Sequence, residues 1–234
     1  MTGMYIKELW RYPVKSMRGE QLEEAVLTTN GVAGDRLIHV RGSYGPLTAR
    51  TRYGMLGLAA TTGPDGKALI NGRPWDDPVT TKEIRAVAGP DAEAVEYDGH
   101  ERFDVLPLLV ATDGALTAFG YDYRRLRPNI VIGGVPGLAE RDWPGLALRA
   151  GGALIGMLKL RARCVVTTLD PDTTDQDLDV LRMLNRQYEG RFALDSWVAE
   201  EGTIRVGDPV ELVAGCPTGP RPGGWIVGAP YTVP

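Results

Sequence analysis

Pairs of turn-forming residues between short apolar runs restrict the fold of this chain more than any other feature. Asn30-Gly31 separates the strand-like residues 22–28 from residues 36–40, and Asn71-Gly72 follows another apolar run. An asparagine followed by a glycine adopts the left-handed backbone angles of a two-residue hairpin turn more readily than most pairs. Residues 5–80 are therefore predicted to form a small, twisted β unit.

From residue 103 onward the pattern predicts further strands and two helices. Thr112-Asp113 offers N-cap chemistry for a short helix that ends at Phe119. The strongest helix signal covers residues 175–188, begins with a possible capping box at Thr174 and Asp177, and ends at Gly190. Its predicted apolar face consists of Leu178, Leu181, Leu184 and Tyr188. The expected strands cover residues 105–111, 129–132, 154–168, 197–198 and 210–213. The predicted fold class is mainly β with a few helices.

The expected boundary between two parts of the chain is the charge-mixed, glycine-containing segment 89–101. We therefore predict an N-terminal β domain over residues 1–95 and a second domain over residues 96–213. The last part, residues 214–234, is rich in glycine and proline and is predicted to be an extended tail.

Composition excludes several classes of partner. The formal net charge is −4 without a basic run, which argues against nucleic acid as a partner. No apolar stretch is long enough for a leader peptide or a membrane span. The two cysteines, Cys164 and Cys216, are too few for a secreted disulfide scaffold, so a reducing, cytoplasmic location is expected.

The chain also lacks the residues for several kinds of redox or metal site. His39 and His100 are its two histidines, so a histidine-rich zinc site cannot be built, and both are expected to be structural. Two cysteines cannot hold an iron–sulfur cluster, and no Gly-x-Gly-x-x-Gly pattern follows a strand. If the chain catalyses a redox reaction, its electrons must come from another protein.

Cys164 is the candidate reactive residue. It lies in an apolar run that is strand-like by composition, and strand alternation would place it on the face opposite Arg161 and Arg163. A lone cysteine in a strand is usually a buried core thiol. Neighbouring guanidinium groups, where they reach the sulfur, favour the thiolate, which is the form that binds soft metals. Both interpretations remain open from the residues alone.

Several basic residues stand in turns or extended segments. Lys15 and Ser16 follow a proline-constrained bend, Arg36 follows a glycine turn, and Thr48 and Arg50 would share one face of a strand. Arg127 and Asn129 flank a proline and would also share a face. Guanidinium groups bind phosphate through two hydrogen bonds, and an asparagine amide can bind the edge of a heterocycle. Each residue alone is best explained as a solvated charge, but together they suit a polyvalent anion that carries a polar ring.

These segments and several others resemble the MOSC family, which is named after the C-terminal domain of molybdenum cofactor sulfurase. The N-terminal segments that carry the resemblance are Tyr12-Pro-Val-Lys-Ser16, Gly31-Val-Ala-Gly-Asp-Arg36 and Leu47-Thr-Ala-Arg50. The later ones are Arg127-Pro-Asn-Ile130, Glu140-Arg-Asp-Trp143, Arg163-Cys164 with Thr167-Thr-Leu-Asp-Pro171, and Gly202-Thr-Ile-Arg-Val-Gly-Asp208. They occur in the order found in the family and span about residues 5–213.

The resemblance implies a fold and a site. The fold would be a MOSC β-barrel domain beside a smaller N-terminal β-barrel-like domain, with the molybdenum cofactor between them. Cys164 would be the catalytic residue and the molybdenum ligand. The residues implied in binding the phosphate and pterin are Lys15, Ser16, Arg36, Arg50, Thr112, Asp113, Arg127, Asn129 and Arg163. The sequence departs from the family pattern at residues 118–127, which look short, at Leu126, where an aromatic residue is common, and at Asp113, which replaces a small hydroxyl residue.

The resemblance also implies an activity. The chain would resemble the amidoxime-reducing component proteins, which are oxidoreductases that reduce N-hydroxylated small molecules with electrons from an external donor protein. One alternative is a carrier module that holds the cofactor or a persulfide at Cys164 without turning over a substrate. Another is a barrel that binds neither.

Overall fold

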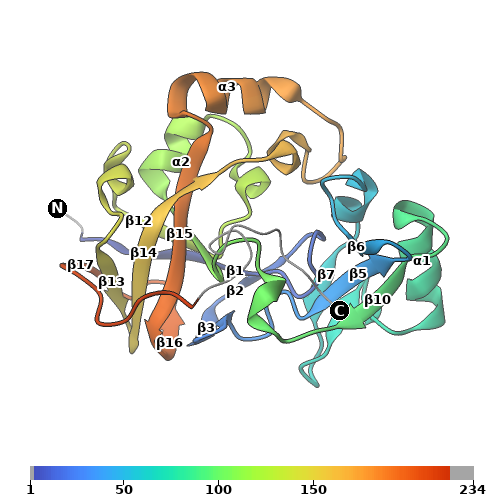
Figure 1. The fold of residues 1–234 in the computed structure, drawn as a ribbon. Coiled ribbons are helices and arrows are strands. Elements are labelled where there is room, and N and C mark those ends of the chain that lie inside the picture. Colours follow the sequence, from blue (N-terminus) through green and yellow to red (C-terminus); the bar gives the residue numbers. More distant parts are fainter. Residues whose placement is uncertain (1–2, 222–234) are drawn as a thin grey trace.

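The computed structural model describes residues 3–221, apart from the side chain of Glu101. Its largest element is an eight-stranded sheet, with strand order β17-β13-β14-β15-β11-β12-β1-β2 (Figure 1). In that order the strands are Val210–Val213, Ala147–Ala150, Ala153–Ala162, Arg191–Glu200, Leu108–Thr112, Ile130–Gly133, Tyr5–Arg11 and Glu20–Leu22. Neighbouring strands are antiparallel except β11 and β12, which are parallel.

Three smaller sheets complete the β structure. Their strand orders are β10-β5-β6, β16-β3-β4 and β7-β8-β9. In chain order these strands are Glu24–Thr28 (β3), Gly31–Val32 (β4), Ile38–Gly42 (β5), Gly45–Leu47 (β6), Ala60–Thr62 (β7), Ala68–Ile70 (β8), Arg73–Pro74 (β9), Glu93–Glu96 (β10) and Gly202–Arg205 (β16). The predicted mainly β fold is confirmed.

The Asn71-Gly72 turn shows why this hairpin could be predicted. Both residues have positive φ, 50° for Asn71 and 79° for Gly72, and they join β8 to β9. Glycine carries no Cβ and asparagine tolerates the left-handed region, so this pair turns the chain with little strain.

The helices agree less closely with the sequence. They are α1 (Pro78–Ala88), α2 (Asp113–Phe119) and α3 (Leu178–Tyr188), with short 3-10 helices at Tyr53–Gly57 (η1), His100–Arg102 (η2), Tyr123–Leu126 (η3), Ala139–Asp142 (η4) and Val165–Thr168 (η5). The prediction of α2 is confirmed, since the Thr112 hydroxyl accepts a hydrogen bond from the Ala115 N–H. The pattern gave no indication of α1, which begins with Asp77 as its N-cap and with a proline.

Helix α3 begins later than predicted and turns a different face to the core. Its N-cap is Asp177, which accepts from the Asp179 N–H, whereas Thr174 lies outside with a φ of 65°. Val180, Leu184 and Tyr188 are buried, but Leu178 at the first position is 47% exposed. The predicted face was therefore wrong at its first residue and correct at Leu184 and Tyr188.

The two largest clusters of buried apolar residues belong to different parts of the fold. The larger core packs against the eight-stranded sheet and includes residues from the start of the chain, such as Ile6, Leu9 and Leu27. The smaller core gathers residues of the β5, β7 and α1 segments, such as Val40 and Ile84. The prediction of one small β unit over residues 5–80 was therefore wrong. Strands β1 and β3 pair with β12 and β16 from the second half of the chain, and β2 and β4 pair with β1 and β3. The smaller unit consists mainly of residues 38–96. The division at residues 95 and 96 stays a prediction.

No helix among the described residues is long and apolar enough to cross a membrane. Of the predicted tail, residues 222–234 lie outside the part of the chain that the structure describes.

Candidate functional site

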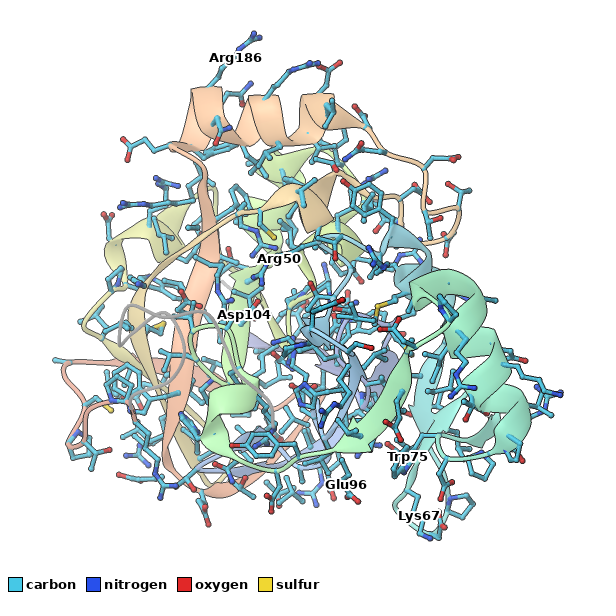
Figure 2. All side chains as sticks on the ribbon, turned by 45° about the vertical axis from the view of Figure 1, so that its right-hand side comes forward. Arg50, Lys67, Trp75, Glu96, Asp104 and Arg186 are labelled. Carbon is cyan, nitrogen blue, oxygen red and sulfur yellow. The ribbon has the colours of Figure 1, made fainter. Side chains whose placement is uncertain are left out.

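A cleft of about 580 Å³ lies between the large sheet and the smaller unit. Seven of the ten residues predicted for the site line it: Lys15, Ser16, Arg36, Arg50, Arg127, Arg163 and Cys164. They come from distant parts of the chain. Figure 2 shows Arg50 and Asp104, another residue of the cleft, in the middle of the molecule.

The other three predicted residues do not line this cleft. Thr112 is buried, and its hydroxyl caps α2 and donates to Glu140 Oε2 at 2.9 Å. The Asp113 carboxylate accepts hydrogen bonds from the backbone N–H groups of Gly114, Gly134 and Val135. The Asp113 carboxylate therefore stabilises a helix start and a loop.

Asn129 joins strands. Its Oδ1 accepts from the Leu109 N–H at 3.2 Å, and its Nδ2 donates to the Trp10 carbonyl at 3.3 Å. Its side-chain amide therefore connects the residue before β12 to the two neighbouring strands, β11 and β1.

Cys164 does not lie within a strand, contrary to the sequence interpretation. Strand β14 ends at Ala162, and Cys164 precedes the 3-10 helix η5, with its carbonyl accepting from the Thr167 N–H and hydroxyl. Because the chain turns here, strand alternation fails, and Arg161 and Arg163 line the same cleft as the thiol. The Cys164 sulfur is partly exposed and hydrogen-bonds the Arg50 side chain.

Arg50 also lies outside a strand. Strand β6 ends at Leu47, and residues 49–51 form a turn. Its guanidinium reaches both the Cys164 sulfur and the Asp104 carboxylate, with 2.7 Å between Nη2 and Oδ2. Burial opposes the charge of Arg50, but Asp104 and Cys164 together raise its pKa.

Asp104 links two of the cleft's cations. Oδ2 of Asp104 binds Arg50, and Oδ1 accepts a hydrogen bond from Lys15 Nζ at 2.8 Å. Lys15 also donates to the Arg102 carbonyl. Burial alone would raise the pKa of Asp104, but the charges of Lys15 and Arg50 outweigh it and lower this pKa. Burial lowers the pKa of Lys15 to about 8, although Asp104 opposes that change. Lys15 is therefore held charged mainly by one carboxylate.

Three cleft residues have left-handed backbones. The φ angles are 68° for Ser16, 54° for Arg36 and 59° for Arg127. A residue with a Cβ is disfavoured there by roughly 1–2 kcal/mol. Surrounding hydrogen bonds hold two of them: Arg36 N–H donates to the Tyr12 carbonyl at 2.8 Å, and Arg127 N–H to that of Arg124 at 3.1 Å. The sequence pointed to restrained backbones at these positions without predicting this conformation.

Buried guanidinium groups with unused hydrogen-bond donors mark the cleft. Arg127 Nη2 and the Nε atoms of Arg125 and Arg163 are buried and have no acceptor among the described residues. Burial lowers the pKa of Arg127 to about 10. Burial and the nearby charge of Arg161 lower the pKa of Arg163 to about 10 as well. A buried donor without an acceptor costs about 1–3 kcal/mol, which an anionic ligand would relieve.

Asp195 was not anticipated. It lies in the middle of β15, has no exposed surface, and pairs with Arg161, while its Oδ2 has no partner among the described residues. Burial raises its pKa, although Arg161 opposes the effect. A carboxylate directly after the apolar run Phe192–Leu194 and shortly before Trp197-Val198 was the one available sequence signal.

The charge of the cleft is strongly positive. Eight lysines and arginines line it, against two aspartates. Those that the sequence did not single out for binding are Arg125, Lys159, Arg161, Asp104 and Asp195. Among the described residues no group of three or more His, Cys, Asp or Glu side chains could hold a metal ion. Cys164 is the one thiol among these cations.

His39 fits the structural role expected for it. It is buried, and burial lowers its pKa to about 3, so it is neutral at physiological pH.

Comparisons with known sequences agree with this arrangement. The profile described as "MOSC N-terminal beta barrel domain" matches residues 3–98, and the one described as "MOSC domain" matches residues 111–211. Human mitochondrial amidoxime-reducing component 1 is 26% identical over an alignment that covers 89% of this chain and 82% of that protein. Human mitochondrial amidoxime reducing component 2 is 30% identical over 46% of this chain, which spans only 37% of that protein's length.

Two solved structures align with the chain at low identity. The YuaD protein from Bacillus subtilis superposes with a TM-score of 0.48 at 13% identity, over 91% of this chain and 97% of that one. YiiM from Escherichia coli superposes with a TM-score of 0.42 at 16% identity, over 87% and 70%. With both domain profiles matched in order along the chain, this protein belongs to the MOSC-domain family.

Proposed function

We propose that the central cleft binds the molybdenum cofactor and that the protein is an oxidoreductase of N-hydroxylated small molecules. The observation that carries the proposal is the position of Cys164: a partly exposed thiol in contact with Arg50, at the edge of a cleft with unused guanidinium donors. Thiolates are preferred ligands of soft metals, and buried arginines suit phosphate.

The residues of the cleft fit the cofactor's chemical parts. Arg127 and Arg163 offer the unused donors, and Arg36, paired with Asp35, and Lys15, paired with Asp104, line the cleft beside them. These four residues would hold the phosphate and pterin, and Cys164 would ligate the metal. When bound, the molybdenum centre supplies two-electron redox chemistry. Thr112, Asp113 and Asn129 would act only from behind the cleft, since their side chains are used within the fold.

The chain's own residues would provide charge and protons. Reducing an N–OH group to N–H with loss of water consumes two electrons and two protons. Lys15, with a pKa near 8, lines the cleft and can hold a proton at neutral pH and release it more readily than an exposed lysine. Burial raises the pKa of Asp195, which lines the same cleft. Burial disfavours the charged form of each group and so shifts the two pKa values in opposite directions.

Electrons would come from a separate donor protein. Two cysteines cannot hold an iron–sulfur cluster, so the chain has no such centre of its own. The names of the relatives, amidoxime-reducing components, support reduction of an N–O bond as the reaction class.

A second candidate is a carrier that holds the cofactor, or a persulfide on Cys164, without turnover. The partial exposure of the Cys164 thiol favours it, because a carrier must present its sulfur to another protein.

One set of assays separates these functions. Protein purified from cells that make the cofactor should contain molybdenum and pterin in equal amounts, approaching one per chain. It should also reduce benzamidoxime to benzamidine with reduced methyl viologen as electron source. Loading without turnover would support the carrier, and absence of molybdenum and pterin would refute both proposals.

A further inference from the structure

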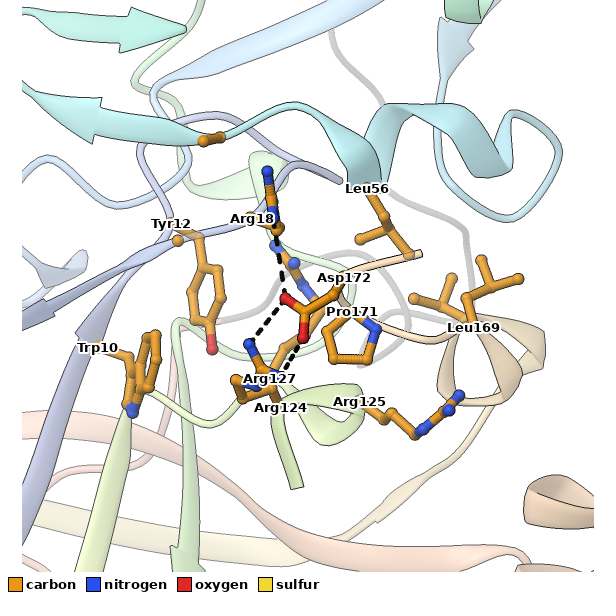
Figure 3. A pocket seen from close by; sticks show the side chains of 13 residues that line it. Trp10, Tyr12, Arg18, Leu56, Arg124, Arg125, Arg127, Leu169, Pro171 and Asp172 are labelled. Atoms are coloured by element: carbon orange, nitrogen blue, oxygen red, sulfur yellow. Dashed lines mark hydrogen bonds and ion pairs between the residues drawn. The ribbon is translucent and has the colours of Figure 1, made fainter. Parts of the chain in front are cut away.

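A second, smaller pocket lies beside the cleft and has not been assigned a ligand. Its volume is about 340 Å³, near the lower end of the roughly 300–1,000 Å³ of small-molecule sites. Arg125, Arg127 and Val166 line both cavities, so the two share a wall. Figure 3 shows Trp10 and Tyr12 on the left of this pocket, Leu56 and Leu169 on the right, and Arg18, Arg127 and Asp172 between them.

The two side walls suit a flat apolar ring. Trp10 and Tyr12 are stacked, with ring centroids 6.5 Å apart and planes inclined by 15°. Leu56, Leu169 and Pro171 supply aliphatic surface to the pocket. Aromatic rings prefer stacked or edge contacts with other rings and bury a large apolar area.

The floor between these walls carries an excess of positive charge. Four arginines line the pocket, against one carboxylate, Asp172. Arg124 binds Asp172 with both Nη atoms, at 3.0 and 2.6 Å, and also pairs with Asp122. Arg125 pairs with Asp170. Asp122, Asp170 and Asp172 together offset three of the four arginine charges, and Arg18 shares Asp172 with Arg124. One positive charge remains, and among the described residues Arg127 is the lining arginine without an ion pair.

Arg18 has hydrogen-bonding capacity to spare. Its Nη2 donates to the Gly57 carbonyl at 3.0 Å, which fixes the side chain. Its Nη1 lies 3.8 Å from Asp172 Oδ1, too far for a hydrogen bond, and its Nε has no acceptor among the described residues. A fixed guanidinium with free donors beside an aromatic wall suits a carboxylate attached to a ring.

We propose that this pocket is a binding site for small aromatic carboxylates. The ring lies between Trp10–Tyr12 and the Leu56 side of the pocket, and the carboxylate accepts hydrogen bonds from Arg18. Arg127 contributes its charge from the shared wall. Arg18, Trp10 and Tyr12 lie outside the larger cleft, so their contribution can be tested in cofactor-free protein, whereas Arg127 is shared by the two sites.

Isothermal titration of the full chain with benzoate tests the proposal. Benzamide, which has the ring without the charge, and acetate, which has the charge without the ring, are the matched ligands. We expect one benzoate per chain, with both matched ligands binding at least about tenfold more weakly, because each lacks one of the two contacts. Failure of benzoate to bind, or equal binding of benzamide, would overturn the proposal.

Three variants locate the site. Arg18→Gln should weaken benzoate binding by at least about tenfold, as loss of a charge-assisted hydrogen bond predicts. Ala59→Phe should abolish it by filling the pocket while leaving Arg18 in place. Arg163→Gln, which alters only the larger cleft, should leave benzoate binding unchanged and lower molybdenum content. If Arg163→Gln weakens benzoate binding as much as Arg18→Gln does, the carboxylate lies in the larger cleft and the proposal is wrong.

Discussion

Replacing Asp104 by asparagine tests how the charges of the cleft are held. Asp104 binds Lys15 at 2.8 Å and Arg50 at 2.7 Å, so the substitution leaves two cations without their carboxylate. Removing one partner of a buried ion pair costs about 3–5 kcal/mol. Asp104 keeps 22% and Arg50 33% of its side-chain surface exposed, and solvent screens part of the charge left behind. We therefore expect a loss of about 3 kcal/mol, the lower end of that range.

Urea unfolding of cofactor-free protein measures this loss. The matched control is Asp179→Asn on α3, whose partner Arg182 is 59% exposed and whose own side chain is 73% exposed. That control should change the free energy of unfolding by less than about 0.5 kcal/mol. Combining Asp104→Asn with Lys15→Met should destabilise less than the sum of the two single changes, because the first leaves the Lys15 charge unpaired. Equal, small effects of Asp104→Asn and Asp179→Asn would refute the reasoning.

Three further predictions concern the same cleft and the second cysteine. Lys15 has a folded pKa of about 8, below its unfolded value of 10.5, so the unfolded chain binds more protons between these values and stability rises with pH there. The slope should reach up to about 1.4 kcal/mol per pH unit, and the rise should disappear in Lys15→Met; an unchanged slope in that variant would exclude Lys15 as its source. Arg36→Ala and Arg127→Ala should each weaken cofactor retention by roughly tenfold to a hundredfold, measured as the pterin content after gel filtration. The control Arg182→Ala should show no change. Equal retention in all three variants would remove Arg36 and Arg127 from the site. Cys216→Ser should leave molybdenum content and melting temperature unchanged, since both cysteines are free; mass spectrometry showing a dominant Cys164–Cys216 bridge in unreduced protein would contradict this.

Local signals in the sequence predicted the Asn71-Gly72 hairpin, helix α2 and much of the cleft. The prediction at Asn30-Gly31 was wrong in its partner strand, because β3 pairs with β4 and β16 whereas β5 pairs with β6 and β10. The turn at Asn71-Gly72 and the cap at Thr112 depend on neighbouring residues, so their structure follows from short-range rules. Seven cleft residues were recognisable through the family pattern of their segments.

Long-range contacts could not be predicted in this way. Asp104 pairs with Lys15 and Arg50, which lie 89 and 54 positions away in the chain. The end of β14 depends on tertiary contacts, since Arg163 N–H donates to the Gly190 carbonyl where the chain leaves the sheet. For this reason alternation placed Cys164 and Arg163 on opposite faces, whereas both line the cleft. Helix α1 was not predicted because the β-branched residues of its first turn have low helix propensity. The helix is stabilised by burial of Ile84 and Ala88 in the tertiary structure.

X-ray absorption at the molybdenum edge tests most directly whether Cys164 ligates the metal in this cleft. We expect the loaded wild-type protein to show one more sulfur neighbour around molybdenum than the Cys164→Ser variant, loaded and measured in the same way. Cys164 is partly exposed, so the serine should change stability little and leave both proteins folded. An identical number of sulfur neighbours in the two proteins would show that Cys164 is not the ligand.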